Sequence, residues 1–286
     1  MSHLCIDIGG TSIKGGVFLD HKLIDTYSYK TNGHSFDLIL KSINRVVNHF
    51  LNKYQDISFI GVSSAGDIDY KHGYCVYASN NLNGFTKFDI KKYFEDNYHL
   101  PTYVNNDAVC HLLGNLKNDN LDKNIFLITL GTGVGAVLYK DKEIFYGEDF
   151  DLGKFAHYEL VHDGYECDCG KKGCAEKEIS SYGLLHDALK ISKNIKSCKD
   201  IFLLYKVGDL KAKKILDEYF NKVNRYLTYI FTLGVDEVII GGGLTKSRDI
   251  FRKYILDKRI KFSEHGSLAA LYGANYLICN RYDLFR

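Results

Sequence analysis

The feature that most restricts how this chain can fold is a short run of metal-binding side chains between His157 and Cys174. One imidazole is followed by the thiols of Cys167, Cys169 and Cys174, and this set completes the tetrahedral coordination of a zinc ion. The glycines of the motif Cys-x-Cys-Gly-x-x-Gly-Cys allow tight turns that would aim the sulfurs inward. Incidental cysteines rarely come with glycine spacers and a well-placed histidine. With no fifth ligand nearby in the sequence, the segment predicts a closed, structural zinc site, so catalytic chemistry must lie elsewhere.

The overall composition excludes several classes of function. Lysine and arginine (37) nearly balance aspartate and glutamate (35), so no global field attracts nucleic acid or an anionic membrane. The N-terminal residues lack the pattern of a secretory signal, and no run of about 18 apolar residues could span a bilayer. Cys5, Cys75, Cys110 and Cys279 lie in or beside apolar runs, which is typical of reduced, buried thiols. We therefore expect a cytoplasmic protein without nucleic-acid or membrane partners.

The first part of the chain predicts an α/β unit. Short strands surround the turn Gly9-Gly10-Thr11, and segments with apolar residues at helical spacing alternate with further strands. The expected strands cover residues 3–8, 13–19, 23–29, 57–62 and 102–104. The expected helices cover residues 38–54, 90–98 and 108–116.

A second unit begins near residue 125 and repeats the pattern of the first. Apolar strands at 125–130 and 134–139 surround Gly131-Thr132-Gly133. Farther along we expect a strand at 238–240 and helices at 178–192, 209–233 and 268–279. Strand, glycine turn and strand thus occur twice, which predicts two related α/β halves.

Three glycine-rich turns could bind a nucleotide. Asp7 stands at a strand end just before the first turn, where backbone N–H groups can approach a polyanion with no side chain in the way. The turn within 130–135 repeats this device, and the glycines at 241–243 follow an isoleucine-rich strand, where a purine or ribose would need bare backbone. None of them is a Walker A loop or a G-x-G-x-x-G fingerprint. One such turn could be a simple hairpin, but two in one chain favour phosphate binding.

Asp107 is the candidate for a general base. It lies between a buried strand and a helix, and the positive end of the helix dipole should keep it ionised. It could then accept a proton from an attacking hydroxyl. An ordinary N-cap aspartate is an equally good interpretation of the residue in isolation. Glu176, just after the cysteine motif, is likewise ambiguous alone.

Six segments together resemble the ROK family of sugar kinases and sugar-responsive repressors. In the family's order, they are residues 7–14 (DIGGTSIK), 61–69 (GVSSAGDID), 106–107 (ND), 130–135 (LGTGVG), 157–176 and 240–244 (IGGGL). The segment Cys-x-Cys-Gly-x-x-Gly-Cys-x-Glu is the specific part, since glycine turns are shared with all actin-like ATPases. The resemblance implies an actin-like (ribonuclease H-like) ATPase duplication, with two α/β domains and a cleft between them. The expected domains are residues 1–107 with 268–286, and residues 108–267.

The resemblance also implies roles for individual residues in an ATP-dependent hexose kinase. Asp107 would take the proton from the primary hydroxyl of the sugar, and the sugar would be held by Asn106, His157, Glu176 and Gly66. His157 would use one ring nitrogen for zinc and the other for a sugar hydroxyl. ATP and its Mg²⁺ would be held by Asp7, Gly9, Gly10, Thr11, Lys14, Gly131, Thr132, Gly133, Gly241, Gly242 and Gly243. A structural Zn²⁺ would be bound by His157, Cys167, Cys169 and Cys174.

One residue departs from the family pattern. The family's Glu-x-Gly-His reads Lys154-Phe155-Ala156-His157 here, so a lysine replaces a glutamate that would contact the sugar. Three interpretations stay open: an altered substrate with an acidic substituent, a Lys154 side chain turned to solvent, or weakened activity. Glu159 and His162 are also three residues apart, like the family's glutamate and histidine. An alignment on this pair would shorten the interval between the histidine and Cys167 and lose the family's zinc spacing.

Several functions remain compatible with these residues. The leading hypothesis is a kinase for glucose or an N-acetylated hexosamine such as N-acetylmannosamine. A sugar-sensing repressor would need a DNA-binding helix-turn-helix before the first glycine turn. That turn begins at residue 9, which leaves no room for one, so we do not expect a repressor. A catalytically silent sugar-binding protein is conceivable because of Lys154. The resemblance further suggests a homodimer or homotetramer.

Overall fold

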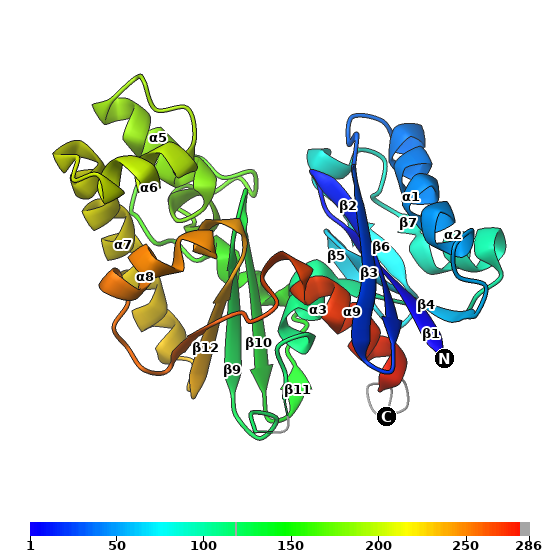
Figure 1. Ribbon diagram of the computed structural model, residues 1–286. Coiled ribbons are helices and arrows are strands. Elements are labelled where there is room, and N and C mark those ends of the chain that lie inside the picture. The colour runs from blue at the N-terminus through cyan, green and yellow to red at the C-terminus, as the bar shows by residue number, and fades with distance from the viewer. Residues whose placement is uncertain (118, 281–286) are drawn as a thin grey trace. The chain divides into compact units, whose positions relative to one another are not determined.

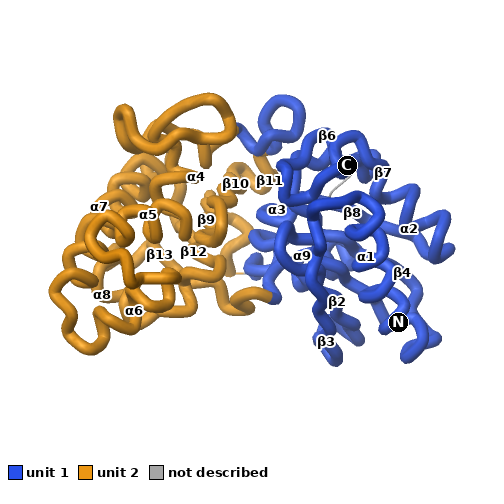
Figure 2. Tube along the Cα trace, turned by 90° about the horizontal axis from the view of Figure 1, so that it is seen from above, with its two compact units in different colours: residues 1–118, 146–153, 268–286 blue, residues 119–145, 154–267 orange. Residues whose placement is uncertain are grey.

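The structure, a computed structural model, describes residues 1–117 and 119–280. The chain forms two compact units, which Figure 2 distinguishes by colour. Unit 1 comprises Met1–Asn118, Tyr146–Gly153 and Leu268–Arg286, and unit 2 comprises Asp119–Phe145 and Lys154–Ser267. The short segment 146–153 therefore belongs to unit 1, although the residues on both sides of it belong to unit 2.

Unit 1 contains a five-stranded sheet and a smaller three-stranded sheet. Its strands are β1 (Ser2–Ile8), β2 (Ser12–Leu19), β3 (Lys22–Lys30), β4 (Ile57–Ser64), β5 (Asp67–Asp69), β6 (Tyr74–Tyr77), β7 (Phe88–Asp89) and β8 (Thr102–Asn106). Its helices are α1 (Phe36–Leu51), α2 (Ile90–Tyr98), α3 (Asp107–Leu113), α9 (Ala269–Cys279) and the 3₁₀ turn η1 (Asn80–Leu82). The larger sheet has the order β3-β2-β1-β4-β8, and the smaller one has the order β5-β6-β7. Figure 1 labels all of these strands except β8. β1 runs antiparallel to β2 and parallel to β4, which runs parallel to β8.

The spacing of the apolar residues in α1 determines which face of this helix packs on the sheet. The buried apolar residues of α1 recur at helical spacing, at Ile39, Ile43, Val46, Val47 and Phe50. A Cβ at Gly15 of β2 would lie 2.5 Å from Phe50 and 2.7 Å from Val46. The absence of a side chain at Gly15 therefore allows α1 to approach the sheet closely.

Unit 2 repeats the main sheet of unit 1. Its strands are β9 (Ile125–Leu130), β10 (Val134–Lys140), β11 (Glu143–Ile144), β12 (Glu237–Gly241) and β13 (Ile260–Phe262). Its helices are α4 (Ala175–Glu178), α5 (Ser181–Ile191), α6 (Cys198–Lys206), α7 (Leu210–Phe231), α8 (Arg248–Tyr254) and the 3₁₀ turn η3 (Gly243–Ser247). The sheet order β11-β10-β9-β12-β13 matches that of unit 1, with an antiparallel meander followed by parallel strands. The predicted duplication of an α/β unit is confirmed.

Two further 3₁₀ turns lie where the chain passes from the residues of one unit to those of the other. They are η2 (Leu152–His157) and η4 (Gly266–Leu268). Among the helices of residues 1–117 and 119–280, none has both the length and the apolar character that a membrane crossing requires.

Some element boundaries differ from the sequence-based expectation. The helix expected at 178–192 is interrupted, because Ile179 ends α4 and Ser180 has the extended conformation of an N-cap for α5. The helix expected to reach residue 54 ends at Leu51. Helix α6 was not expected. Cys279 is exposed, so the prediction that it is a buried thiol was wrong, whereas the other three cysteines of that set are buried.

Candidate active site

Asp7 is the centre of a hydrogen-bonded group at the end of β1. The register of the sheet sets Asp7 opposite Ser63 of β4 and Lys14 of β2. Asp7 Oδ1 accepts a hydrogen bond from Ser63 Oγ at 2.9 Å, and Asp7 Oδ2 accepts one from Lys14 Nζ at 2.8 Å. Asp7 is only 6% exposed, so these two bonds hold its carboxylate in one orientation. Two of the predicted cofactor residues, Asp7 and Lys14, are thus in direct contact.

The turn after β1 is rigid at its base and open at its tip. Gly9 N donates to Ser12 O at 3.1 Å, and Gly9 O accepts from Thr31 Oγ1 at 2.5 Å. Gly10 and Thr11 are exposed. A turn with a fixed base and accessible backbone N–H groups has the shape that phosphate binding requires.

Asn106 connects three parts of unit 1 at the end of β8. Its Oδ1 accepts from the backbone N–H groups of Ala108 and Val109 at 2.8 and 3.1 Å, so Asn106 is the N-cap of α3. Its Nδ2 donates to Gly66 O at 2.7 Å and keeps a second N–H for another acceptor. Gly66 has φ 110°, and a Cβ there would lie 2.6 Å from Tyr77 O. The structure therefore brings together two of the predicted sugar-binding residues, Asn106 and Gly66.

Asp107 is the first residue of α3, directly after the N-cap. Its Oδ1 accepts a hydrogen bond from Ala108 N at 2.8 Å. Burial raises the pKa of Asp107 to about 7, and the nearby carboxylate of Asp7 adds to the shift. The helix terminus was expected to keep Asp107 ionised, but desolvation outweighs that attraction, so the carboxyl is only partly ionised at neutral pH. A carboxyl with a pKa near neutrality suits a group that takes and releases protons.

One polar contact of unit 1 was missed by the sequence analysis. Asn105 Nδ2 donates to Tyr146 Oη at 2.8 Å, directly beside the predicted Asn106 and Asp107. The available signal was a second asparagine directly before Asn106 at the end of β8. No motif marks Tyr146, which reaches this position only through the fold.

The four predicted metal ligands meet in unit 2. The ligand atoms of His157, Cys167, Cys169 and Cys174 all lie within 4.8 Å of one another. His157 Nδ1 is 3.5 Å from Cys167 Sγ, and the sulfurs of Cys169 and Cys174 are 3.6 Å apart. Two thiolates on a tetrahedral zinc, each with a Zn–S bond of about 2.3 Å, lie about 3.8 Å apart. The donor set and its spacing therefore fit a zinc ion.

Backbone hydrogen bonds fold the cysteine segment into this arrangement. Cys167 N donates to Lys171 O at 2.8 Å, which closes the turn between the cysteines. Gly173 O accepts from both Leu160 N and Val161 N, at 2.7 and 3.1 Å. A Cβ at Gly173, whose φ is 69°, would lie 1.6 Å from Val161 O. Only glycine fits at residue 173, which explains this glycine of the motif.

Glu176 links the metal cluster to the second glycine turn. Its Oε2 lies 3.5 Å from His157 Nδ1 and 3.7 Å from Cys167 Sγ. Its Oε1 lies 2.9 Å from the position that a Cβ of Gly133 would occupy. Within unit 2, the predicted sugar ligands His157 and Glu176 therefore lie beside a predicted phosphate-binding turn.

The two glycine turns of unit 2 are neighbours. Gly131 N donates to Gly133 O at 3.0 Å, and Thr132 at the tip of this turn is exposed. A Cβ at Gly242, whose φ is 90°, would lie 2.4 Å from Leu130 O, so this glycine allows the 241–243 turn to pack against the strand that enters the first turn. Both turns can therefore serve one extended ligand.

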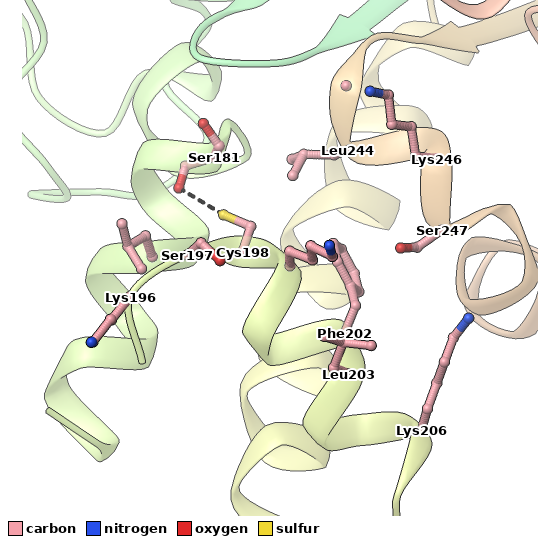
Figure 3. A pocket seen from close by; sticks show the side chains of 13 residues that line it. Ser181, Lys196, Ser197, Cys198, Phe202, Leu203, Lys206, Leu244, Lys246 and Ser247 are labelled. Atoms are coloured by element: carbon pink, nitrogen blue, oxygen red, sulfur yellow. Dashed lines mark hydrogen bonds between the residues drawn. The ribbon is translucent and has the colours of Figure 1, made fainter. Parts of the chain in front are cut away.

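A pocket of about 740 Å³ opens beside Gly243 (Figure 3). Leu244 and Phe202 contribute apolar surface, and Lys246 belongs to the same η3 turn as Leu244. Ser181 also lines the pocket, and its backbone N–H donates to Gly131 O at 2.8 Å. The pocket is thus joined to the Gly131 turn. The apolar side chains could contact a flat heterocycle, and the lysines could pair with phosphates attached to it.

Lys154, the departure from the family pattern, is exposed and has φ 52°. The alternative pair, Glu159 and His162, form an ion pair at 3.0 Å on the surface, with side chains 57% and 97% exposed. Neither residue of that pair belongs to the cluster of predicted metal ligands, which contains His157. His157 therefore remains the histidine that corresponds to the one in the family's Glu-x-Gly-His.

The profile of the ROK family matches residues 3–277. The chain belongs to the ROK family. A glucokinase from Halalkalibacterium halodurans is 29% identical over 87% of this chain and 82% of its own. An N-acetyl-D-glucosamine kinase from Vibrio atlanticus is 27% identical over 95% of this chain and 97% of its own.

Solved structures of ROK proteins have the same fold. A Listeria monocytogenes protein proposed to be an N-acetylmannosamine kinase matches with a TM-score of 0.84 and 25% identity, over 98% of this chain and 100% of that one. A ROK glucokinase from Streptomyces griseus, in complex with glucose and AMPPNP, matches with a TM-score of 0.81 and 24% identity, over 96% of this chain and 98% of that one. The predicted actin-like ATPase fold is confirmed.

Proposed function

We propose that this ROK protein is an ATP-dependent kinase that phosphorylates the primary (6-) hydroxyl of a hexose, glucose or an N-acetylated hexosamine. Sugar kinase activity is supported by the glucokinase and N-acetylglucosamine kinase relatives. The observation that carries the proposal is Asp107, whose pKa is raised to about 7 by burial at the start of α3. Such a group can accept the sugar proton at neutral pH and release it after each turnover.

Asp107 acts as the general base in this proposal. The sugar oxygen attacks the γ-phosphorus, the bond to the bridging oxygen of ADP breaks, and the hydroxyl proton passes to the Asp107 carboxylate. Asn106 holds the sugar with the N–H that Gly66 O leaves available. The same Asn106 fixes the start of α3, so it holds the base as well as the substrate.

The glycine turns and Asp7 hold ATP and Mg²⁺. Mg²⁺ would neutralise the charge that develops on the phosphoryl oxygens. Asp7, oriented by Ser63 and Lys14, would accept hydrogen bonds from the water shell of the metal. Backbone N–H groups of the turns at 9–11 and 131–133 would donate to the phosphates. The pocket beside Gly243 takes the nucleoside.

Zinc and the sugar share His157 in this proposal. Nδ1 of His157 faces the sulfur cluster, which leaves Nε2 to bind a sugar hydroxyl. Glu176, whose Oε1 lies beside the Gly133 turn, accepts hydrogen bonds from hydroxyls near the anomeric carbon. Each of these polar groups rejects sugars that leave it without a partner. The zinc ion is structural and holds the side chains of His157 and Glu176 in their positions.

Lys154 keeps a second function open. Lys154 is exposed and stands where the family has a glutamate, so a cation there would favour an acidic acceptor or leave a sugar-binding protein with weak catalysis. An N-acetylmannosamine kinase is a narrower form of the leading proposal, supported by the Listeria structure. Assembly as a homodimer or homotetramer and a cytoplasmic location remain predictions.

A coupled assay of ADP release over a panel of acceptors tests the function. The panel contains glucose, N-acetylglucosamine, N-acetylmannosamine and gluconate, which is acidic and keeps its primary hydroxyl. We expect sugar-dependent ADP release with at least one acceptor and none with 6-deoxyglucose, the matched control without a 6-hydroxyl. Tight sugar binding by calorimetry, without turnover for any acceptor, would instead identify a silent sugar-binding protein.

A further inference from the structure

Residues 146–153, which we call the strap, have an unusual backbone conformation. Asp149, Phe150 and Leu152 have φ values of 51°, 61° and 54°, in a region that bulky residues rarely adopt. The strap closes on itself, because Leu152 N donates to Tyr146 O at 2.8 Å. Such backbone strain persists only where surrounding contacts enforce it, and it is concentrated at functional sites.

An aromatic cluster supplies these contacts within unit 1. Tyr70, just after β5, stacks on Tyr146 with ring centroids 4.1 Å apart and planes 19° apart. Phe150 meets Tyr70 edge-on at 6.0 Å and Tyr146 at 6.5 Å. Both arrangements are favourable for aromatic rings. Since β5 begins directly after Gly66, the cluster ties the strap to the hairpin that carries a predicted sugar-binding residue.

The phenol of Tyr146 fixes the side chain of Asn105. Asn105 Nδ2 donates to Tyr146 Oη at 2.8 Å, and Asn105 Oδ1 accepts from Asn106 N at 2.8 Å. Both ends of the amide are therefore in use, which sets its orientation. Asn105 is 1% exposed, so its Nδ2 could not turn to solvent if the phenol were lost. Burial raises the pKa of Tyr146, so the phenol remains uncharged at neutral pH.

We propose that Tyr146 is a positioning residue for phosphoryl transfer, which acts on Asp107 through Asn105. The residues Asn105, Asn106 and Asp107 are consecutive, so the amide of Asn105 fixes the peptide N–H of Asn106 and, through it, the first turn of α3. Loss of the phenol would leave Asn105 Nδ2 buried without an acceptor, so the amide would no longer be held in one orientation. The start of α3, and with it Asp107, would be held less firmly, while the glycine turns would stay intact. This inference rests on the proposed kinase function.

Kinetics of Tyr146→Phe test the inference. This variant keeps the ring stack and removes only the hydroxyl. We expect kcat to fall about tenfold, the effect of one buried donor left without a partner, while the KM for ATP stays within about twofold. Tyr54→Phe is the matched control, because Tyr54 Oη donates to Asp25 Oδ2 at 3.0 Å elsewhere in unit 1. A kcat of Tyr146→Phe within about twofold of the wild type would overturn the inference.

A double-mutant cycle with Asn105→Ala tests the route of the effect. If Tyr146 acts through Asn105, Tyr146→Phe has no further effect on kcat in the Asn105→Ala background. Independent, multiplying losses would overturn that route. Thermal melting of all four proteins checks that each is folded.

Tyr70→Ala gives a readout that does not depend on turnover. This variant removes the stacking ring, so the strap should open and trypsin should cleave after Lys154 faster than in the wild type. Unchanged cleavage would contradict the role of the aromatic cluster. If the wild-type protein turns over no acceptor, both the kinase function and this inference are refuted. If the wild type is active and Tyr146→Phe has the same kcat, the inference alone is refuted.

Discussion

The first glycine turns of the two units occupy the same place in two sheets of the same strand order, yet they differ in chemistry. Two residues before the turn, unit 1 has Asp7, which faces Lys14 across the β1–β2 pair. The equivalent position in unit 2 is Thr129, which faces Gly135, and its Oγ1 accepts from Gly135 N at 3.0 Å. A carboxylate–ammonium pair in one unit is thus replaced by an uncharged contact in the other. The duplicated fold supplies two anion-binding shapes, and the charged group lies in unit 1.

The segments that follow the turns extend this difference. In unit 1, β8 leads directly into α3 and the buried carboxyl of Asp107. In unit 2, the segment between His157 and Glu176 brings the four predicted metal ligands together, and Glu176 lies beside the Gly133 turn. Unit 1 therefore carries the groups proposed for proton transfer and Mg²⁺, together with the predicted sugar ligands Asn106 and Gly66. Unit 2 carries the cluster of predicted metal ligands, the predicted sugar ligand Glu176 and the pocket proposed for the nucleoside. Changes in the two units should have separable effects.

The largest effect is expected from Asp107→Asn. The amide has nearly the same shape but cannot accept the sugar proton, so kcat should fall by about 10²–10⁴-fold. Sugar affinity measured by calorimetry should stay within about tenfold, roughly 1.4 kcal/mol. Asp25→Asn is the control, because Asp25 is an aspartate of unit 1 that pairs with Lys53. Turnover close to that of the control would exclude Asp107 as the base.

In unit 2, Cys174→Ser should remove the metal and weaken sugar binding. Metal analysis should find about one zinc per wild-type chain and little in the variant, because the thiolate of a buried ligand is lost. Sugar affinity should fall by about 10–100-fold as His157 and Glu176 lose their support. Cys279→Ser is the matched control, since Cys279 is an exposed cysteine of α9 in unit 1 and lies outside the cluster. A zinc-free and fully active wild-type preparation would contradict this prediction.

Local sequence patterns predicted many of the helices and strands and the grouping of His157 with Cys167, Cys169 and Cys174. Helix α2 and strand β9 begin and end at the expected residues, because a strong periodicity and clear turn signals define them. The cysteine cluster was predictable because its ligands are close in sequence. Helix α6 was missed because its periodic signal is weak: its buried residues are only Ile201 and Phe202.

Properties that depend on distant residues could not be predicted. The pKa of Asp107 depends on its burial and on Asp7, which comes from another strand. The contact between Asn105 and Tyr146 exists only because residues 146–153 pack with unit 1. In both cases the deciding partner is brought close by the tertiary fold, which a motif does not encode.

The raised pKa of Asp107 predicts a pH dependence that originates in unit 1. Since the carboxylate is the active form, kcat/KM for the sugar should rise about tenfold per pH unit below 7 and level off above it. Between about pH 4 and pH 7, Asp107 stays protonated in the native state, whereas in the unfolded chain, where its pKa is 3.8, it loses the proton. The contribution of Asp107 to stability should therefore fall as the pH rises from about 4 to about 7. A pH–rate profile with an inflection near 4 would show that Asp107 is not shifted or not the base.

The same substitution in the two turns should separate ligand binding from stability. A Cβ at Gly131 would meet only Gly133 O at 4.0 Å, whereas a Cβ at Gly10 would lie 2.9 Å from Asn81 Cβ. Gly131→Ala should therefore keep the stability of the wild type but raise the KM for ATP by about fivefold, because its methyl group enters the space proposed for a phosphate. Gly10→Ala should additionally lower the free energy of unfolding by about 1–3 kcal/mol through overpacking, as urea denaturation would show. An unchanged KM for ATP in Gly131→Ala would mean that the uncharged turn of unit 2 does not hold the phosphates, which would leave the charged turn of unit 1 to do so.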